Sequence, residues 1–297
     1  MTRRKRFRLK LRCGALLLGE RTLIMGVLNV TPDSFSDGGR YFAPEEAIER
    51  ALEIEQQGAD LLDVGGESTR PGSGGTPAEE ELRRVLPVLE GLRGRLKIPI
   101  SIDTKKAEVA EAAVAAGAQI INDISGLRND PRIAEVAART RVPLILMHMR
   151  GEPRTMQRLP FARDARRDVA AGLRAAVEKA LRAGVARAQI VVDPGIGFGK
   201  SFRQNYELLA HLPELARLGC PLLVGTSRKT FLGATLARGG AYAPPDERIW
   251  GTAATVTASI LGGAHIVRVH EVAEMVELVR VADCVLNPKL APPDKRL

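Results

Sequence analysis

Polar side chains that suit ligand binding stand at the ends of short apolar runs in this sequence. Asp103, Asn122 and Asp193 each end such a run, and Lys229 lies shortly after another. A buried carboxylate or carboxamide can take paired N–H bonds from the edge of an amino-pyrimidinone ring, and burial makes that recognition strict. These four residues therefore predict a site for a flat heteroaromatic compound with many hydrogen-bond donors and acceptors.

A second group of polar residues suits an anion. Asn29, Thr69, Arg70, Arg268 and His270 lie at or after the ends of other apolar runs, and guanidinium groups bind phosphate oxygens in bidentate geometry. Each residue taken alone has a simpler interpretation, which is that it satisfies a strand end or a turn. Their recurrence along the chain favours a phosphate-like ligand beside the heteroaromatic one.

Eight apolar runs, each ending in a polar residue followed by glycine or turn chemistry, predict eight strands. The predicted strands cover residues 22–30, 61–64, 98–102, 120–123, 143–147, 190–193, 221–225 and 266–269. Helical patterns follow at 44–57, 77–92, 105–116, 131–139, 162–183, 205–211, 251–261 and 272–285, with a short extra helix near 231–237. This alternation predicts an α/β fold, a single (β/α)8 TIM barrel, whose active site forms at the C-terminal ends of the strands.

The chain of 297 residues has no linker or shift in composition that would divide the barrel. We expect residues 1–20 to form a basic N-terminal arm and a short capping hairpin, and residues 21–297 to form one (β/α)8 barrel domain. Two long Gly-rich loops, at 31–43 and 65–76, follow predicted strand ends and are predicted to be lids of the active site.

The formal net charge of +9 is concentrated at the N-terminus. Seven of the 44 basic residues lie in the first twelve positions, and the rest of the chain carries 37 basic against 35 acidic residues. This distribution predicts a solvated arm, and an aromatic content of 4% disfavours base stacking. We therefore expect no nucleic-acid partner.

No stretch is apolar enough to span a bilayer, and the basic start lacks the other features of a signal peptide, so no membrane partner or secretion is expected. The three cysteines, Cys13, Cys220 and Cys284, are far apart in the sequence. They form neither a metal-ligand spacing nor a disulfide framework, which predicts a cytoplasmic protein.

Two segments carry a family resemblance. Residues 25–39, MGVLNVTPDSFSDGG, closely resemble the first signature of dihydropteroate synthases, and residues 63–72, DVGGESTRPG, resemble the second. Further matches follow in order at 101–104, 121–126, 147–151, 155–157, 193–200, 225–233 and 268–270. One departure is Ile196, where some relatives carry phenylalanine, although Phe198 remains available to cover a ring.

The resemblance implies a folate-pathway transferase that joins p-aminobenzoate to 6-hydroxymethyl-7,8-dihydropterin diphosphate, giving 7,8-dihydropteroate and pyrophosphate. It assigns the pterin to Asp103, Asn122, Met147, Asp193, Phe198, Gly225 and Lys229. It assigns the diphosphate to Asn29, Thr69, Arg268 and His270, with Mg²⁺ bound through Asn29 and the phosphate oxygens. It assigns p-aminobenzoate to Thr69, Arg70, Pro71, Phe198, Ser227 and Lys229, and catalytic roles to Arg70, Asp103, Lys229, Arg268 and His270. It also implies a homodimer and inhibition by sulfonamides, which mimic p-aminobenzoate.

The chemistry agrees with this assignment. An aryl amine is already unprotonated at neutral pH, so the reaction needs no base to activate it, and the sequence shows no evident His–Asp or Cys–His nucleophile pair. The reaction needs assistance to a highly charged leaving group by a metal and cationic side chains. Asp103 is then placed to stabilise positive charge on the pterin methylene. Gly225, Ser227 and the following helix start offer N–H groups to the p-aminobenzoate carboxylate.

Three other functions are weighed against the synthase. A pterin-binding methyltransferase that serves a corrinoid would share the pterin pocket but would need no diphosphate site, so Asn29, Arg268 and His270 favour the synthase. A non-catalytic pterin-binding protein would have lost part of a loop or the diphosphate ligands, and none is missing. Nucleic-acid binding through the basic arm is the third.

Four other polar residues stay outside the predicted site. His211 and His265 are interpreted as structural, and His148 as structural or as a support for residues that contact the ligand. Lys200 follows a Gly-rich turn, and its role is left open between a solvated loop charge and a functional group.

Overall fold

Eight parallel strands close into a barrel at the centre of the molecule. They are β3 (Leu23–Asn29), β4 (Leu61–Gly65), β5 (Ile100–Asp103), β6 (Ile120–Asp123), β7 (Leu144–Met147), β8 (Ile190–Asp193), β9 (Leu223–Val224) and β10 (Ile266–Val269). The computed structural model describes residues 4–31, 44–68, 73–152, 155–156 and 161–293. The strand order is β8-β7-β6-β5-β4-β3-β10-β9. A parallel bridge between Val192 and Leu222 joins the two ends, so the sheet returns on itself and the predicted TIM barrel is confirmed.

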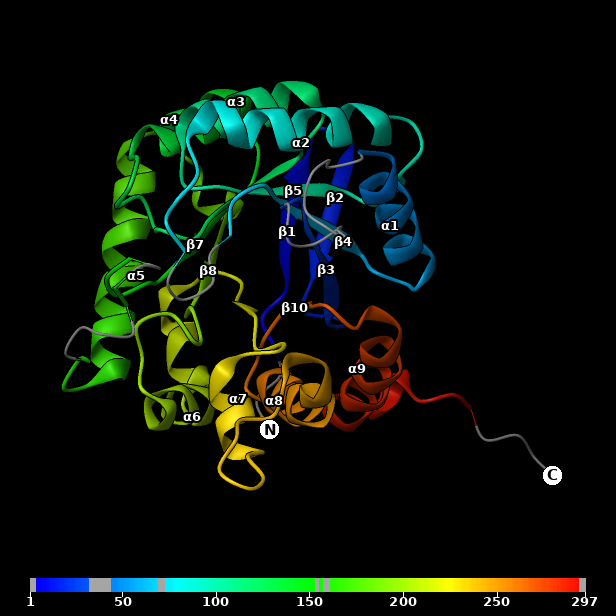
Figure 1. Ribbon diagram of the computed structural model, residues 1–297, viewed down its shortest axis with the longest axis vertical. Coiled ribbons are helices and arrows are strands. Elements are labelled where there is room, and N and C mark those ends of the chain that lie inside the picture. The colour runs from blue at the N-terminus through cyan, green and yellow to red at the C-terminus, as the bar shows by residue number, and fades with distance from the viewer. Residues whose placement is uncertain (1–3, 32–43, 69–72, 153–154, 157–160, 294–297) are drawn as a thin grey trace.

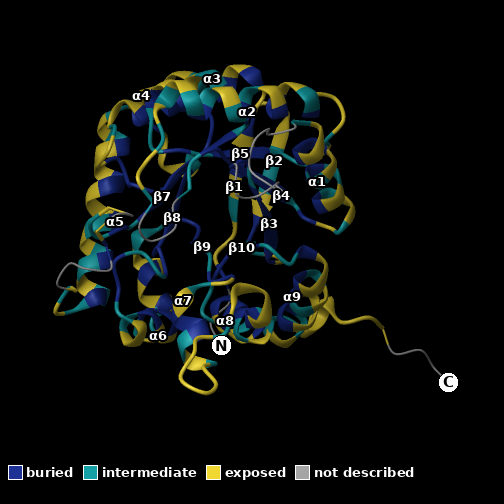
Figure 2. Cartoon of the chain, viewed as in Figure 1, coloured by how far each residue is buried: buried dark blue, intermediate teal, exposed yellow. Residues whose placement is uncertain are grey.

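Helices surround the barrel in chain order (Figure 1). They are α1 (Pro44–Gln56), α2 (Ala78–Leu92), α3 (Ala107–Ala116), α4 (Arg132–Thr140), α5 (Ala165–Arg182), α6 (Phe202–Ala210), α7 (Thr230–Thr235), α8 (Ile249–Leu261) and α9 (Val272–Leu286). Short 3-10 turns lie at Arg187–Gln189, Leu212–Leu218, Pro245–Arg248 and Pro288–Leu290. Figure 2 shows buried residues on the helix faces toward the barrel and exposed residues outside, as expected for amphipathic helices packed on a sheet.

The start of α6 differs from the prediction. The sequence pattern placed it at Asn205, but the helix begins at Phe202 after Ser201. The Ser201 hydroxyl accepts a hydrogen bond from the Gln204 backbone at 3.2 Å, and the Gln204 side chain accepts one from the Ser201 backbone at 3.0 Å. This reciprocal capping box satisfies two free backbone N–H groups and starts the helix three residues earlier.

The N-terminal end of the barrel is filled by apolar side chains. Strands β1 (Phe7–Leu11) and β2 (Gly14–Leu18) form the predicted antiparallel hairpin. Its Leu9, Leu11 and Leu18 pack against the inward-facing residues of the barrel, which are Leu23, Met25, Leu61, Ile120, Ile145, Val191, Leu223 and Ile266. The hairpin therefore closes this end of the barrel, and a ligand can enter at the opposite end.

One layer further along the strands, the inward positions become polar. Strand side chains alternate between the two faces, so the residue two positions after an inward apolar residue also points inward. Leu61 is followed in this way by Asp63, Ile120 by Asn122, Val191 by Asp193 and Ile266 by Arg268. The apolar layer inside the barrel is therefore followed by a polar layer, which is built from the C-terminal ends of different strands.

The prediction that the N-terminal arm is solvated is wrong for Arg4. Its side chain is buried, and the guanidinium donates to the Ala264 carbonyl at 2.8 Å and to the Asp283 carboxylate at 2.5 Å. Asp283 also accepts from the Thr22 backbone at 2.6 Å. The arm is therefore tied to helix α9, because a buried carboxylate of α9 needs a cationic partner.

Candidate active site

A cavity of about 850 Å³ opens at the C-terminal ends of the strands. Every predicted site residue that the structure describes lines it, namely Asn29, Asp103, Asn122, Met147, Asp193, Phe198, Gly225, Ser227, Lys229, Arg268 and His270. Thr69, Arg70 and Pro71 lie outside the described residues, as do residues 32–43 and 69–72 of the predicted lids. The barrel thus brings both predicted polar groups to one place, while their individual roles stay predictions.

The floor of the cavity is an ion-pair network around Arg268. Its Nε donates to Asp63 Oδ2 at 2.7 Å, and its Nη2 donates to Asp103 Oδ2 at 3.0 Å. Asn122 Nδ2 donates to the same Asp63 oxygen at 3.0 Å. Burial opposes the charge on Arg268, but the two carboxylates outweigh it and raise the guanidinium pKa. These two charge-assisted hydrogen bonds, one to each carboxylate, hold Arg268 in one orientation under the cavity.

Asp63 is a residue of the site to which sequence reasoning assigned no role, although it lies at a predicted strand end and in the second family signature. Its side chain is completely buried, and among the described residues its Oδ1 has no hydrogen-bond partner. Its place two residues after the inward-facing Leu61 was the sequence feature that could have indicated this position.

Burial and the nearby Asp63 charge raise the pKa of Asp103, although Arg268 opposes the shift.

Asp193 is buried beside the cavity at the end of β8. Its Oδ1 accepts a hydrogen bond from the Gly195 backbone at 2.7 Å. Burial raises the pKa of Asp193 to about 6, against the opposing effects of the Gly195 N–H and the Lys229 ammonium. The carboxylate is therefore ionised at neutral pH, with its other oxygen available to accept an N–H bond from a ligand.

An apolar slot lies beside these polar groups. Ile124, Met147, Met149 and Met156 form a buried cluster against Phe198. The Lys229 ammonium lies 3.8 Å from the centre of the Phe198 ring, a cation–π contact. Burial, and then the charge of Arg268, lower the pKa of Lys229 to about 8. A flat ring can therefore contact methionine and phenylalanine side chains while its edge meets carboxylate, carboxamide and ammonium groups.

Gly197 keeps this slot open. Its φ of +87° lies in the left-handed region that favours glycine. A Cβ at this position would lie 2.9 Å from Lys229 Cδ. A side chain here would therefore displace Lys229 from the Phe198 ring.

Lys200, whose role was left open, is a structural tie. Its ammonium donates to the carbonyls of His148 at 3.2 Å, Gly195 at 2.8 Å and Phe198 at 2.9 Å. These three bonds join the loops that follow β7 and β8, and so position Phe198.

Burial lowers the pKa of His148 to about 3, which leaves its ring neutral. That agrees with its structural interpretation.

Several lining residues carried no sequence signal of their own. Arg50 reaches the cavity from α1, Arg248 from the turn before α8, and Thr230 as the first residue of α7. Thr230 follows Lys229 directly, so its position could have been inferred from the short helix. Arg50 and Arg248 lie on other elements, so only the folded chain brings them to the cavity.

Asn29 is the predicted magnesium ligand. It ends β3 and lines the same cavity as Arg268 and His270. Among the described residues no three His, Cys, Asp or Glu side chains cluster as a metal site. A single carboxamide oxygen nevertheless fits Mg²⁺, which prefers oxygen ligands, keeps several waters and often takes the rest from substrate phosphates.

The fold and the cavity define a TIM-barrel protein with a polar pocket at the C-terminal ends of its strands. Residues 25–270 match the family described as pterin binding enzyme, and the chain belongs to this family.

The relatives of the chain include dihydropteroate synthases. The chain is 50% identical over 267 residues to the enzyme of Synechocystis, covering 90% of this chain and 91% of that protein. The solved Xanthomonas albilineans dihydropteroate synthase with 4-aminobenzoic acid has a TM-score of 0.87 at 42% identity, covering 97% of this chain and 100% of the other. The structure of the same enzyme with 7,8-dihydropteroate has a TM-score of 0.83 at 41% identity, covering 96% and 100%.

Proposed function

We propose that the protein is a dihydropteroate synthase, which condenses 6-hydroxymethyl-7,8-dihydropterin diphosphate with p-aminobenzoate and releases pyrophosphate. The observation that carries the proposal is one cavity in which Asn122 and Asp193 adjoin Arg268 and His270. A pterin-binding methyltransferase would not need the second pair. The Xanthomonas albilineans structures with 4-aminobenzoic acid and 7,8-dihydropteroate support the same substrates.

The pterin would lie in the slot between Met147 and Phe198. Its N–H edge would donate to Asp193 and its ring polar atoms would meet Asn122 and Lys229. Because these protein groups are buried, a ring that lacked the matching atoms would leave them unpaired, at a cost of about 1–3 kcal/mol each. Pterin specificity would follow from this penalty.

The diphosphate would lie toward Asn29, Arg268 and His270, with Thr69 assigned by resemblance. Asn29 would hold Mg²⁺ together with the phosphate oxygens, and the ion would supply charge neutralisation when bound. Arg268 is held by Asp63 and Asp103, so its remaining N–H groups are oriented before the substrate binds. This preorganisation lowers the barrier to departure of a charged leaving group.

The amine would attack without a base. The aryl amine is unprotonated at neutral pH, so the protein must orient it and stabilise charge at the pterin methylene. Asp103 would stabilise that charge, while Lys229 and Phe198, together with Thr69, Arg70 and Pro71, would contact p-aminobenzoate. Sulfonamides, as mimics of p-aminobenzoate, would compete at the same place.

A direct assay tests this function. Purified protein is mixed with Mg²⁺, dihydropterin diphosphate and p-aminobenzoate, and both pyrophosphate and dihydropteroate are measured. We expect equal amounts of the two products. A protein that binds methyl-folate but never releases pyrophosphate would favour the methyltransferase function. Failure to restore growth of a folate-requiring, synthase-deficient cell, despite abundant protein, would favour a non-catalytic one.

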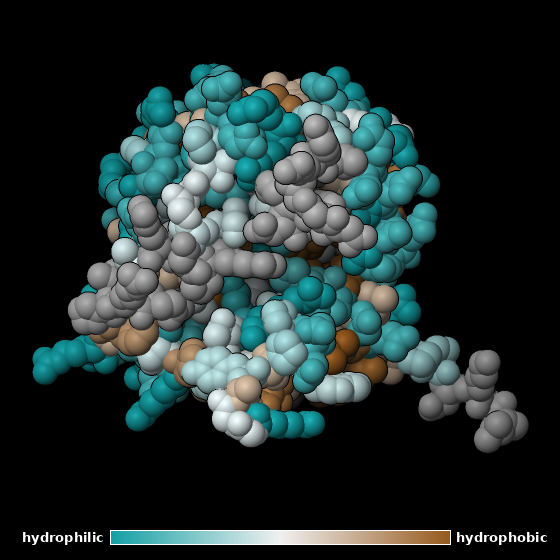
Figure 3. Space-filling model, viewed as in Figure 1, coloured by the Kyte–Doolittle hydropathy of each residue, from teal (hydrophilic) through white to brown (hydrophobic). Residues whose placement is uncertain are grey.

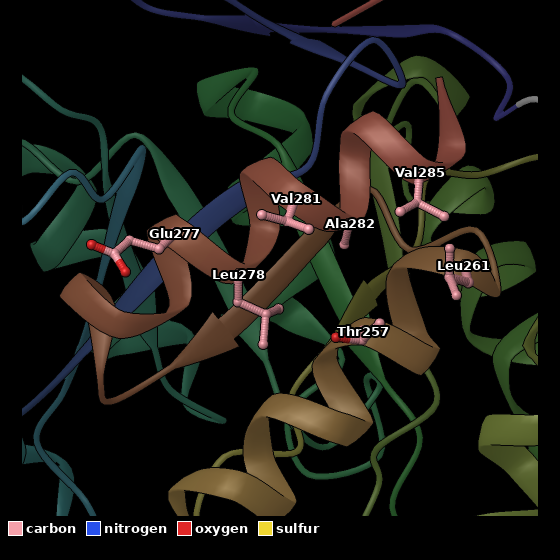
Figure 4. A pocket seen from close by; sticks show the side chains of 7 residues that line it. All are labelled: Thr257, Leu261, Glu277, Leu278, Val281, Ala282 and Val285. Atoms are coloured by element: carbon pink, nitrogen blue, oxygen red, sulfur yellow. The ribbon is translucent and has the colours of Figure 1, made fainter. Parts of the chain in front are cut away.

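We also propose that the protein is a homodimer through helices α8 and α9. An apolar groove of about 360 Å³ lies between them, lined by Thr257, Leu261, Glu277, Leu278, Val281, Ala282 and Val285 (Figure 4). Val281 is 66% exposed and Val285 56% exposed. Figure 3 shows hydrophobic residues near α8 and α9 on an otherwise largely hydrophilic face. A second copy, related by a two-fold axis, would cover these side chains.

We place the reaction in the cytoplasm. The three cysteines are unpaired, as a reducing compartment would keep them. Within the described part of the chain, no helix is long and apolar enough to cross a membrane.

A further inference from the structure

A chain of hydrogen bonds leads away from His270, one of the predicted diphosphate ligands, to the side chains of two further residues and an arginine. His270 Nδ1 is 2.8 Å from the Ser227 hydroxyl, and this hydroxyl is 3.0 Å from Glu271 Oε2. The other oxygen of Glu271 accepts from Arg228 Nε. The residues come from the loop after β9 and from the junction of β10 with α9, and nothing in the family resemblance assigns a role to Glu271 or Arg228.

The hydrogen bonds can be counted at the Ser227 oxygen. A serine hydroxyl donates one bond and accepts two, while a carboxylate only accepts. The Ser227 proton therefore goes to Glu271, and one lone pair takes the His270 backbone N–H at 3.2 Å. The remaining lone pair takes a proton from His270 Nδ1. This arrangement fixes a hydrogen on Nδ1 of His270 and holds the ring in one orientation.

Glu271 is itself held in place. Its side chain is only 11% exposed, and Arg228 pairs with it. Arg228 has a left-handed φ of +61°, and its backbone is fixed on both sides. Its carbonyl accepts from Arg248 Nη1 at 2.7 Å, and its N–H donates to Thr252 Oγ1 at 3.3 Å. The Glu271 carboxylate is therefore held by contacts other than its bond to Ser227, as an effective positioning group must be.

We propose that Glu271 is a positioning residue for this reaction, acting through Ser227 to set the tautomer and orientation of His270 toward the diphosphate. The inference rests on the proposed function. The proposed role of Glu271 resembles that of the carboxylates that hydrogen-bond metal-binding histidines. Such a carboxylate fixes the orientation of the ring that contacts the ligand. On this view the hydroxyl of Ser227 serves His270, while its predicted contact with p-aminobenzoate stays a prediction.

The first test compares Glu271→Gln with wild type by calorimetry. Two ligands are used, dihydropterin diphosphate and 6-hydroxymethyl-dihydropterin, which lacks the diphosphate. We expect the variant to bind the diphosphate about 10–100-fold more weakly, a range typical of lost outer-shell partners. Binding of the diphosphate-free pterin should be unchanged. A purely structural role would weaken both ligands together, and that result would overturn the proposal.

Two matched variants complete the comparison. Glu274→Gln alters an exposed carboxylate in the first turn of the same helix and should bind both ligands like wild type. Glu271→Asp keeps the charge and should restore part of the lost affinity. If Glu271→Gln and Glu274→Gln behave alike, Glu271 has no positioning role.

A double-mutant cycle tests the path through Ser227. If Glu271 acts only through this hydroxyl, Glu271→Gln should add nothing to the loss caused by Ser227→Ala. Fully additive losses would overturn the relay, and Ser227→Ala also keeps the test usable if Glu271→Gln does not fold. These experiments measure ligand binding, so their results do not depend on whether the protein turns over its substrates. A wild-type protein that binds the diphosphate but makes no dihydropteroate would contradict the proposed function alone.

Discussion

Asp193 meets opposing demands from folding and from binding. Burial raises its pKa from 3.8 to about 6, so the folded protein holds this proton more tightly than the unfolded chain. The resulting contribution to stability is present below about pH 4 and is lost as the pH rises through about 6. At neutral pH the ionised carboxylate therefore costs stability, and its proposed use is to accept the pterin N–H group.

We predict that pterin affinity falls about tenfold for each pH unit below about 6, as Asp193 becomes protonated. Asp193→Asn should weaken pterin binding by roughly 2–4 kcal/mol at neutral pH and remove this dependence, since the amide presents a donor where an acceptor is needed. It should also raise the melting temperature at neutral pH. Calorimetry across this pH range measures the binding. Unchanged pterin binding would mean that Asp193 is only a strand-end residue.

Asp103 bears on the order of bond events. If the diphosphate departs before the amine attacks, the pterin methylene becomes a cation that a carboxylate at Asp103 would stabilise. We predict that substrate labelled with heavy oxygen at the bridging position exchanges the label into non-bridging positions in the presence of Mg²⁺ but without p-aminobenzoate. Asp103→Asn should slow this exchange, which mass spectrometry or phosphorus NMR can follow.

The complementary outcome is equally specific. Pyrophosphate that forms only when the amine is present, with no exchange of label, would favour concerted displacement. Exchange at the wild-type rate in Asp103→Asn would remove the proposed role of the carboxylate. Neither result changes the substrates of the proposed reaction.

At the scale of elements, the N-terminal arm and helix α9 depend on each other. Arg4 and Asp283 form a buried ion pair, with side-chain exposures of 2% and 5%. We predict that Asp283→Asn lowers the free energy of unfolding by about 3 kcal/mol, because it leaves the buried guanidinium without its counter-charge. Urea denaturation measures this change.

The exposed Arg8 on the same arm provides the control. Arg8→Met should leave the unfolding free energy within about 0.5 kcal/mol of wild type. The substrate KM values should not change in either variant, since both positions lie at the closed end of the barrel. A small effect of Asp283→Asn would mean that the arm contributes little to the fold.

At the scale of the whole molecule, the groove between α8 and α9 defines the proposed dimer. We predict that Val281→Asp converts the dimer to a monomer, because it buries an unpaired carboxylate in an apolar contact. Sedimentation velocity checks the result. Leu17→Asp, which alters an exposed apolar residue of the hairpin, should leave the dimer intact. A wild-type protein that sediments as a monomer would contradict the interface.

The barrel itself was predictable from the sequence, because strand and helix periodicities are local. Strands β6, β8 and β10 have the predicted bounds, and α1 and α9 differ from prediction by one residue at their ends. The family resemblance is confirmed over residues 25–270. The errors have particular causes: a capping box moved the start of α6, and a distant carboxylate on α9 buried Arg4.

The sequence by itself determined the order of the elements and the polar residue at the end of each strand, since both follow from neighbouring positions. Only the tertiary structure decided which of these residues meet. Arg268 pairs with Asp63 across 205 positions, and Ser227 with Glu271 across 44. Such contacts depend on the register with which the sheet closes on itself. That register is set by side-chain packing among strands that are remote in sequence.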